Sequence, residues 1–86
     1  MKHRATKTFW KLYGELDPPI QRQARKQYRR LRQNPKHPSL RFKPVGKLWS
    51  ARVNDDYRAL AVKNKDGYVW FWIGPHRVYD QILSRS

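Results

Sequence analysis

The sequence contains no cysteine, only four glycines and only six acidic residues among 86. The absence of cysteine excludes disulfide bonds and thiol chemistry. No hydrophobic run approaches the roughly 20 residues that a membrane-spanning helix needs. The basic N-terminus is not followed by an apolar segment of the kind found in secretory signals. We therefore expect a cytoplasmic protein with no membrane partner.

A metal centre is also disfavoured. The three histidines lie far apart in the sequence and acids are few, whereas metal sites need several such ligands close together. The four glycines form no phosphate-cradling motif. We therefore predict a protein that needs no metal and no other cofactor.

Positive charge is the most prominent feature that is present. Twenty lysines and arginines against six acids give a formal net charge of +14. The basic residues are divided equally between 1–34 and 35–86, so the charge belongs to the whole chain rather than to a tail. Such a field attracts polyanions, most often nucleic acid, although an acidic protein could neutralise the same surface. Aromatic residues make up 14% of the chain, which favours a folded core over a disordered basic segment.

The spacing of apolar residues predicts helices first and strands afterwards. Two helices, over 6–16 and 18–33, are expected to form a hairpin around Asp17-Pro18-Pro19. The apolar stripe of the second helix is predicted at Ile20, Ala24, Tyr28 and Leu31. A loop over 34–39, strands over 40–45, 48–53, 57–62 and 68–73, and a short helix over 77–84 are predicted to follow.

This order indicates a single α+β domain over 1–86. An N-terminal helical hairpin would pack on an antiparallel β-meander of about four strands, and a short C-terminal helix would complete the fold. The segment 68–73 is apolar on both faces, so we expect it to form a central strand that is covered on both sides.

The second predicted helix carries the densest cluster of positive charge. Six of the eleven residues from Arg22 to Arg32 are basic, and no acid interrupts them. A solvated helix exterior is one interpretation, and a surface that binds phosphates or an acidic partner is the other. The predicted RNA-binding or ribosome-binding residues are Arg22, Arg25, Lys26, Arg29, Arg30, Lys43 and Lys47.

Arg52 and Arg58 lie within predicted strands. A guanidinium on the face of a sheet must reach a solvated groove or pair with a carboxylate. Asp55 and Asp56 occupy the adjacent turn and could serve as partners. The sequence leaves structural pairing and anion binding equally open for the two arginines.

His76 follows the most hydrophobic predicted strand, and Tyr79 lies three residues further on. The end of a strand holds side chains rigidly at the rim of a sheet, and histidine can transfer protons near neutral pH. The alternative interpretation is a histidine that only caps the following helix.

Four segments resemble the RelE/ParE superfamily of bacterial type II toxins. They are NPKHPSL at 34–40, LWSARV at 48–53, DYRAL at 56–60, and WIGPH at 72–76 with Tyr79 after it. The resemblance extends to the order of elements along the whole chain, with one departure. The N-terminus is predicted to be helical at once, whereas the family usually begins with a strand.

The resemblance implies a toxin that cuts mRNA on the ribosome, with an acidic antitoxin that neutralises it. In the ParE branch the target is instead DNA gyrase, and an inactive RNA-binding member is a third possibility. Carried over residue by residue, the catalytic candidates are Arg52, Arg58, His76 and Tyr79. The arginines would bind the phosphate, and His76 and Tyr79 would assist proton transfer. No acid clearly matches the general base that some branches use.

Overall fold

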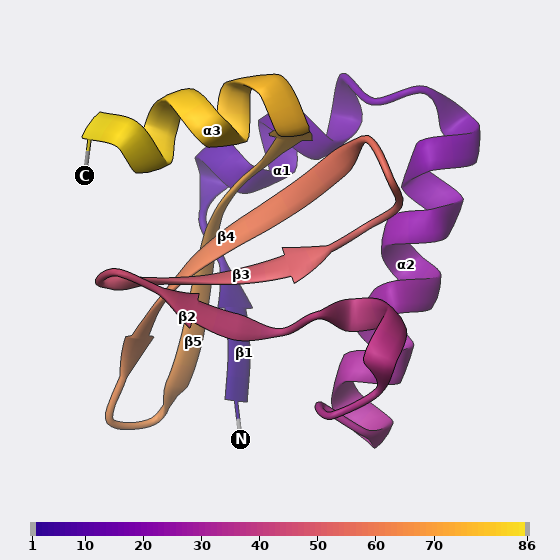
Figure 1. Cartoon of the computed structure of the whole chain (residues 1–86). Coiled ribbons are helices and arrows are strands. Elements are labelled where there is room, and N and C mark those ends of the chain that lie inside the picture. The colour runs from indigo at the N-terminus through magenta and orange to yellow at the C-terminus, as the bar shows by residue number, and fades with distance from the viewer. Residues whose placement is uncertain (1, 86) are drawn as a thin grey trace.

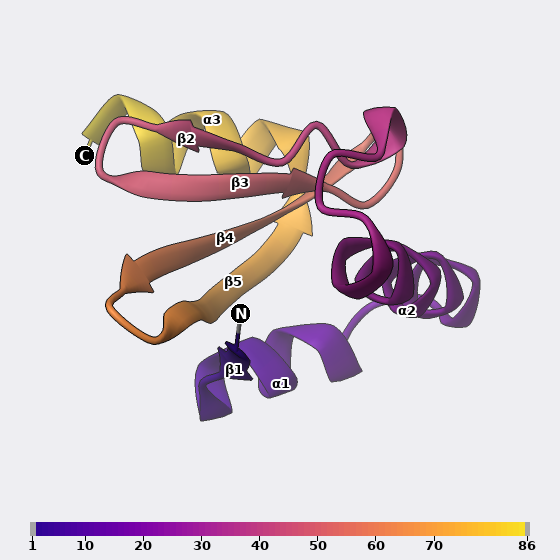
Figure 2. The same cartoon turned by 90° about the horizontal axis from the view of Figure 1, so that it is seen from below.

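The computed structural model describes residues 2–85, which form one five-stranded sheet with helices on both faces (Figures 1 and 2). The elements are β1 (Lys2–Ala5), α1 (Lys7–Gly14), α2 (Pro18–Gln33), the 3₁₀ turn η1 (Pro38–Leu40), β2 (Lys43–Val45), β3 (Leu48–Arg52), β4 (Tyr57–Asn64), β5 (Gly67–Pro75) and α3 (His76–Arg85). The strand order is β1-β5-β4-β3-β2. Figure 2 shows α1 and α2 on one face of the sheet and α3 on the other.

This arrangement confirms the predicted α+β class, the helical hairpin, the antiparallel meander and the C-terminal helix. The central position of β5 is also confirmed, because β5 pairs with β1 on one side and β4 on the other. Its faces are covered by α1 and by α3. Within residues 2–85, no helix combines the length and the hydropathy required to cross a bilayer.

The prediction of a helix directly at the N-terminus is wrong. Lys2–Ala5 forms β1, which runs parallel to β5 with Lys2 opposite Gly67. Helix α1 begins only at Lys7, where the hydroxyl of Thr6 caps it by accepting a hydrogen bond from the amide of Phe9 (3.1 Å). The β1–β5 pair joins the two ends of the chain, so no local pattern in the sequence could indicate it.

The first predicted strand, over 40–45, is also too long. Leu40 ends the turn η1 and is almost fully buried, and Arg41 then has a left-handed backbone with φ of 44°. The strand β2 therefore starts only at Lys43. A proline at the first position of the turn favours this local coil over a continuous strand.

The main core lies between the sheet and the α1–α2 hairpin. Its buried members are Leu31, Leu40, Ala51, Val53, Ala59, Ala61, Tyr68, Trp70 and Ile73. The predicted stripe of α2 is only partly correct, because Leu31 is buried but Tyr28 is 42% exposed. The buried position beside Leu31 belongs instead to a polar residue, Gln27.

Candidate functional site

Two arginines meet on the face of the sheet that carries α3. In the register of the sheet, Arg52 of β3 lies directly opposite Arg58 of β4. Ser50, two residues before Arg52, accepts a hydrogen bond from the hydroxyl of Tyr79 in α3 (2.9 Å). Because side chains alternate between the faces of a strand, Ser50, Arg52 and Arg58 share this face. Like charges directly opposite each other repel, so the pair favours a nearby anion.

Both arginines also have bonds within the protein. Arg52 Nη2 forms an ion pair with Asp55 Oδ1, and Arg58 Nη1 donates hydrogen bonds to the carbonyl oxygens of Asn54 and Tyr57. Each arginine uses one terminal nitrogen for these bonds. A guanidinium has five N–H donors, so the other nitrogens of each arginine keep donors for a ligand. The Asp55 side chain is 89% exposed, so a competing anion can reach this ion pair from solvent.

A third cation lies near this pair. The pKa of Arg58 is lowered first by burial and then by the positive charge of Arg52, with a smaller contribution from Arg41 in the same direction. Tyr79 and Asp55 act in the opposite direction. Arg58 stays protonated at neutral pH nonetheless, because a guanidinium does not lose its proton in proteins. Arg41 was not predicted as a site residue; it is the left-handed residue that follows η1.

The first turn of α3 joins the site at the end of β5. The backbone amide of His76 donates to the carbonyl oxygen of Asp56 (2.7 Å), which fixes where α3 begins. The His76 ring lies 5.3 Å from the Tyr79 ring between centroids, and its Nδ1 is 3.0 Å from Asp80 Oδ2. With Nδ1 held by Asp80, Nε2 is the nitrogen available for exchanging a proton with a ligand. This pair was not predicted, although the spacing of His76 and Asp80 by one helical turn could have indicated it.

The four predicted catalytic residues therefore come from three neighbouring elements, β3, β4 and α3. Tyr79 is the most buried of them, at 7% exposure, whereas the His76 side chain is 44% exposed. Among residues 2–85 there is no group of three histidine, cysteine or acidic side chains that could hold a metal ion.

Comparison with known proteins identifies the family of this chain. A sequence profile of the ParE-like toxin domain matches residues 18–81. The chain belongs to the ParE-like toxin family. This membership places it in the RelE/ParE superfamily, so the predicted family is confirmed. No curated protein sequence matches the chain significantly.

Solved structures of this superfamily share the fold of the toxin domain. A chain of the RelB–RelE antitoxin–toxin complex from Methanococcus jannaschii aligns with a TM-score of 0.69 and 18% identity over 91% of this chain and 96% of that one. The isolated E. coli RelE toxin aligns with a TM-score of 0.62 and 12% identity over 96% and 95% of the two chains. The YoeB/ParE toxin from Agrobacterium tumefaciens aligns with a TM-score of 0.60 and 18% identity over 83% of this chain and 91% of that one.

The basic cluster on α2 of this ParE-like domain is largely exposed, as the sequence predicted. Arg22, Lys26 and Arg29 project to solvent, and Lys43 and Lys47 are exposed on β2 and in the turn after it. Arg25 is exposed too, and its Nη1 donates to the hydroxyl of Tyr13 (2.6 Å).

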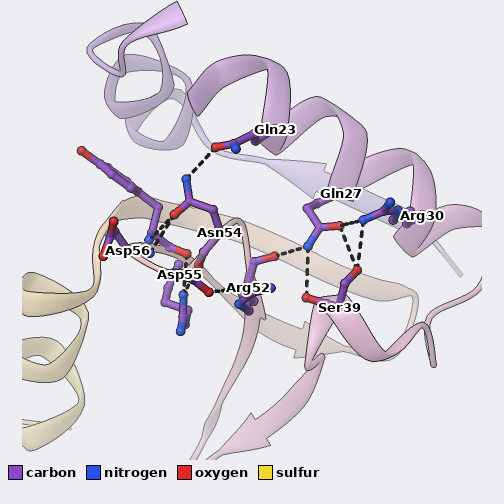
Figure 3. A network of polar contacts seen from close by, with 10 residues as sticks. Gln23, Gln27, Arg30, Ser39, Arg52, Asn54, Asp55 and Asp56 are labelled. Carbon is purple, nitrogen blue, oxygen red and sulfur yellow. Dashed lines mark hydrogen bonds and ion pairs between the residues drawn. The ribbon is translucent and has the colours of Figure 1, made fainter. Parts of the chain in front are cut away.

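Arg30 differs from the other predicted RNA-binding residues. It is half-buried, and its Nη1 donates to Gln27 Oε1 and to Ser39 Oγ, both at 3.1 Å (Figure 3). A polar cleft of about 310 Å³ runs beside this network and is lined by Lys26, Arg30, Arg52 and Asp55 among others. The cleft lies between the basic helix and Arg52.

A second, apolar groove of about 340 Å³ lies between the α1–α2 hairpin and the sheet. Trp10 and Tyr28 line it, and both are unusually exposed for large aromatic residues, Trp10 at 58%. Arg4 and Arg25 contribute positive charge to the same lining. An apolar surface of this kind is typical of protein-binding sites.

Proposed function

We propose that this toxin-family protein is an endoribonuclease that cleaves mRNA on the ribosome and so inhibits translation in the cytoplasm of its host. The observation that supports this function most directly is the position of Arg52 opposite Arg58 on the sheet face that α3 covers, with His76 in the first turn of α3. Cationic groups beside a group that transfers protons are what phosphodiester cleavage requires.

The chemistry can be assigned to named side chains. The 2′-hydroxyl of the RNA loses its proton while its oxygen bonds to phosphorus, and the 5′-oxygen gains a proton as its bond to phosphorus breaks. His76 Nε2 would act as the general base or the general acid in these transfers. Arg52 and Arg58 would neutralise the charge that develops on the phosphate oxygens. Tyr79 would assist by packing against the His76 ring. No step requires a metal ion or another cofactor.

The exposed cations of α2 would bind the ribosome and would take no part in cleavage. Phosphate contacts by lysine and arginine release counterions and bind without sequence preference, which suits ribosomal RNA. Arg22, Lys26 and Arg29 are the strongest candidates because each is exposed. Lys43 and Lys47 would extend this contact along the β2–β3 hairpin.

We further propose that an acidic antitoxin neutralises the protein. The net charge of +14 favours an acidic partner, and the apolar groove offers a place for its apolar side chains. Relatives with this fold come from RelB–RelE antitoxin–toxin complexes.

Programmed ribosomes with a labelled mRNA test the nuclease function. The wild-type protein is expected to cut the mRNA, and His76→Ala should reduce the rate by about 10²–10⁴-fold, the usual contribution of a general acid or base. Arg77→Ala is a matched control, since it removes an exposed cation from the next position of α3. The absence of cleavage by the wild type, or equal rates for wild type and His76→Ala, would overturn the proposal.

DNA gyrase inhibition is the second candidate, because the matching sequence profile is that of the ParE-like toxin domain. It predicts stalled gyrase cleavage complexes in a supercoiling assay and no cut mRNA. The same protein preparation can be tested in both assays, so the two functions are directly distinguishable.

A further inference from the structure

The turn between β3 and β4 touches three of the proposed catalytic residues. The carbonyl oxygen of Asn54 accepts from Arg58 Nη1, and the Asp55 carboxylate pairs with Arg52. The next carbonyl, of Asp56, accepts from the backbone amide of His76 (2.7 Å). Three consecutive residues thus hold the two arginines and the start of α3.

The side chain of Asn54 gives this turn its shape. Its Oδ1 accepts from the amides of Asp56 (2.8 Å) and Tyr57 (2.9 Å), an arrangement in which asparagine closes a turn on its own backbone. Its Nδ2 donates to Gln23 Oε1 of α2 at 2.6 Å, as Figure 3 shows. A single amide therefore fixes the turn internally and also ties it to the basic helix.

We propose that Asn54 is a positioning residue of the nuclease site and that its bridge to Gln23 anchors the site on α2. This inference rests on the proposed function. Asn54 does not need to touch RNA. Its own carbonyl oxygen holds the Arg58 guanidinium. The next two residues, Asp55 and Asp56, hold Arg52 and the backbone of His76 in place. Misplacement of a catalytic group by about 1 Å can lower a rate by about 10²-fold.

The test compares variants that remove different parts of this arrangement. Asn54→Ala removes both functions of the side chain, and we expect kcat on programmed ribosomes to fall by about 10–100-fold with KM within about twofold of wild type. Asn54→Ser retains a side-chain acceptor for the turn but cannot reach Gln23. Asn54→Ser and Gln23→Ala should therefore show equal and smaller losses of a few-fold. Combining them should cause no further loss, because both remove the same bridge.

Asn64 offers a matched control at the other end of β4. Its Oδ1 accepts from the amides of Asp66 and Gly67, both at 2.9 Å, so it closes the β4–β5 turn in the same way as Asn54 closes its own. Asn64→Ala is expected to lose comparable stability but to keep the kcat of wild type. A fall in kcat for Asn64→Ala equal to that for Asn54→Ala would overturn the positioning role.

A measurement without RNA separates this inference from the proposed function. In ¹⁵N NMR spectra, rotation of the Arg58 guanidinium should be slow in the wild type and in Asn64→Ala, and faster in Asn54→Ala. If Asn54→Ala does not fold, Asn54→Ser and Gln23→Ala carry the test. Unchanged Arg58 rotation, or a raised KM with unchanged kcat, would show that Asn54 does not position the site. If the wild type cuts no mRNA, the proposed function fails, and the NMR comparison alone decides whether Asn54 restrains Arg58.

Discussion

Replacing Gln27 by leucine would test how far the fold depends on one buried amide between α2 and the sheet. Gln27 is only 8% exposed, and its Nε2 donates to the carbonyl oxygens of Ser39 (3.1 Å) and Arg52 (2.8 Å). Its Oε1 accepts from Arg30 Nη1 and from the Ser39 hydroxyl. The amide thus joins α2 to the turn η1 and to the end of β3 (Figure 3).

Leucine has a similar volume but can make none of these bonds. Each lost hydrogen bond costs about 1 kcal/mol, and a buried carbonyl left without a donor costs about 1–3 kcal/mol. Arg30 and the Ser39 hydroxyl are half-exposed and can turn to water, so the two carbonyls dominate the loss. The added apolar burial offsets about 1 kcal/mol. The net expectation is a free energy of unfolding lower by about 2 kcal/mol, or a Tm lower by about 8–16 °C.

Urea unfolding followed by circular dichroism measures this difference directly. The midpoint should fall while the slope m stays unchanged, because the surface exposed on unfolding is the same. Gln33→Leu makes the same chemical change at an exposed position of α2 and should stay within about 0.5 kcal/mol of wild type. If Gln27→Leu is as stable as Gln33→Leu, the reasoning from buried hydrogen bonds is wrong.

Three further predictions concern the stability of other parts of the fold. Burial lowers the pKa of His3 below its ordinary 6.5, so the folded state binds fewer protons than the unfolded state. Tm should therefore fall as the pH drops below about 6.5. In thermal scans between about pH 5 and 8, His3→Phe should show a weaker dependence of Tm on pH. Gly67→Ala would place a Cβ 2.0 Å from the carbonyl oxygen of Lys2 at a φ of +153°, so it should cost about 1–3 kcal/mol and remove hydrogen-exchange protection from β1. Tyr79→Phe should cost about 1 kcal/mol in urea unfolding, and Ser50→Ala should add little to it, because both remove one hydrogen bond. Additive losses for the last pair would show that the bond contributes nothing.

Much of the architecture could be predicted because it depends on local patterns. The helices over 18–33 and the C-terminal segment were found from apolar spacing and from prolines at their boundaries, with ends that differ by at most one residue. The meander was found from turn residues between alternating segments. Even the central strand was recognisable, since only a strand covered on both faces can be apolar on both.

The candidate site was predictable only as a set of residue types. Arginines in strands were candidates for an anion site or for structural pairing, and the placement of both on one face requires a particular strand register. A slip of one residue between β3 and β4 would move Arg52 or Arg58 to the opposite face of the sheet. Neither Arg41 nor Asn54 was a site candidate. Arg41 acts on Arg58 only through its charge, and the side chain of Asn54 bonds to Gln23, which lies 31 residues away in the sequence.

The sequence by itself determined the charge, the class of fold and the order of most elements. These properties follow from composition and from periodicities of a few residues, which every copy of the chain carries before it folds. Tertiary structure alone decided that β1 pairs with β5, that Gln27 rather than Tyr28 enters the core, and that the turn after β3 bonds to the start of α3. Those outcomes depend on contacts between residues far apart in the chain, whose energies are settled only when the sheet and helices pack together.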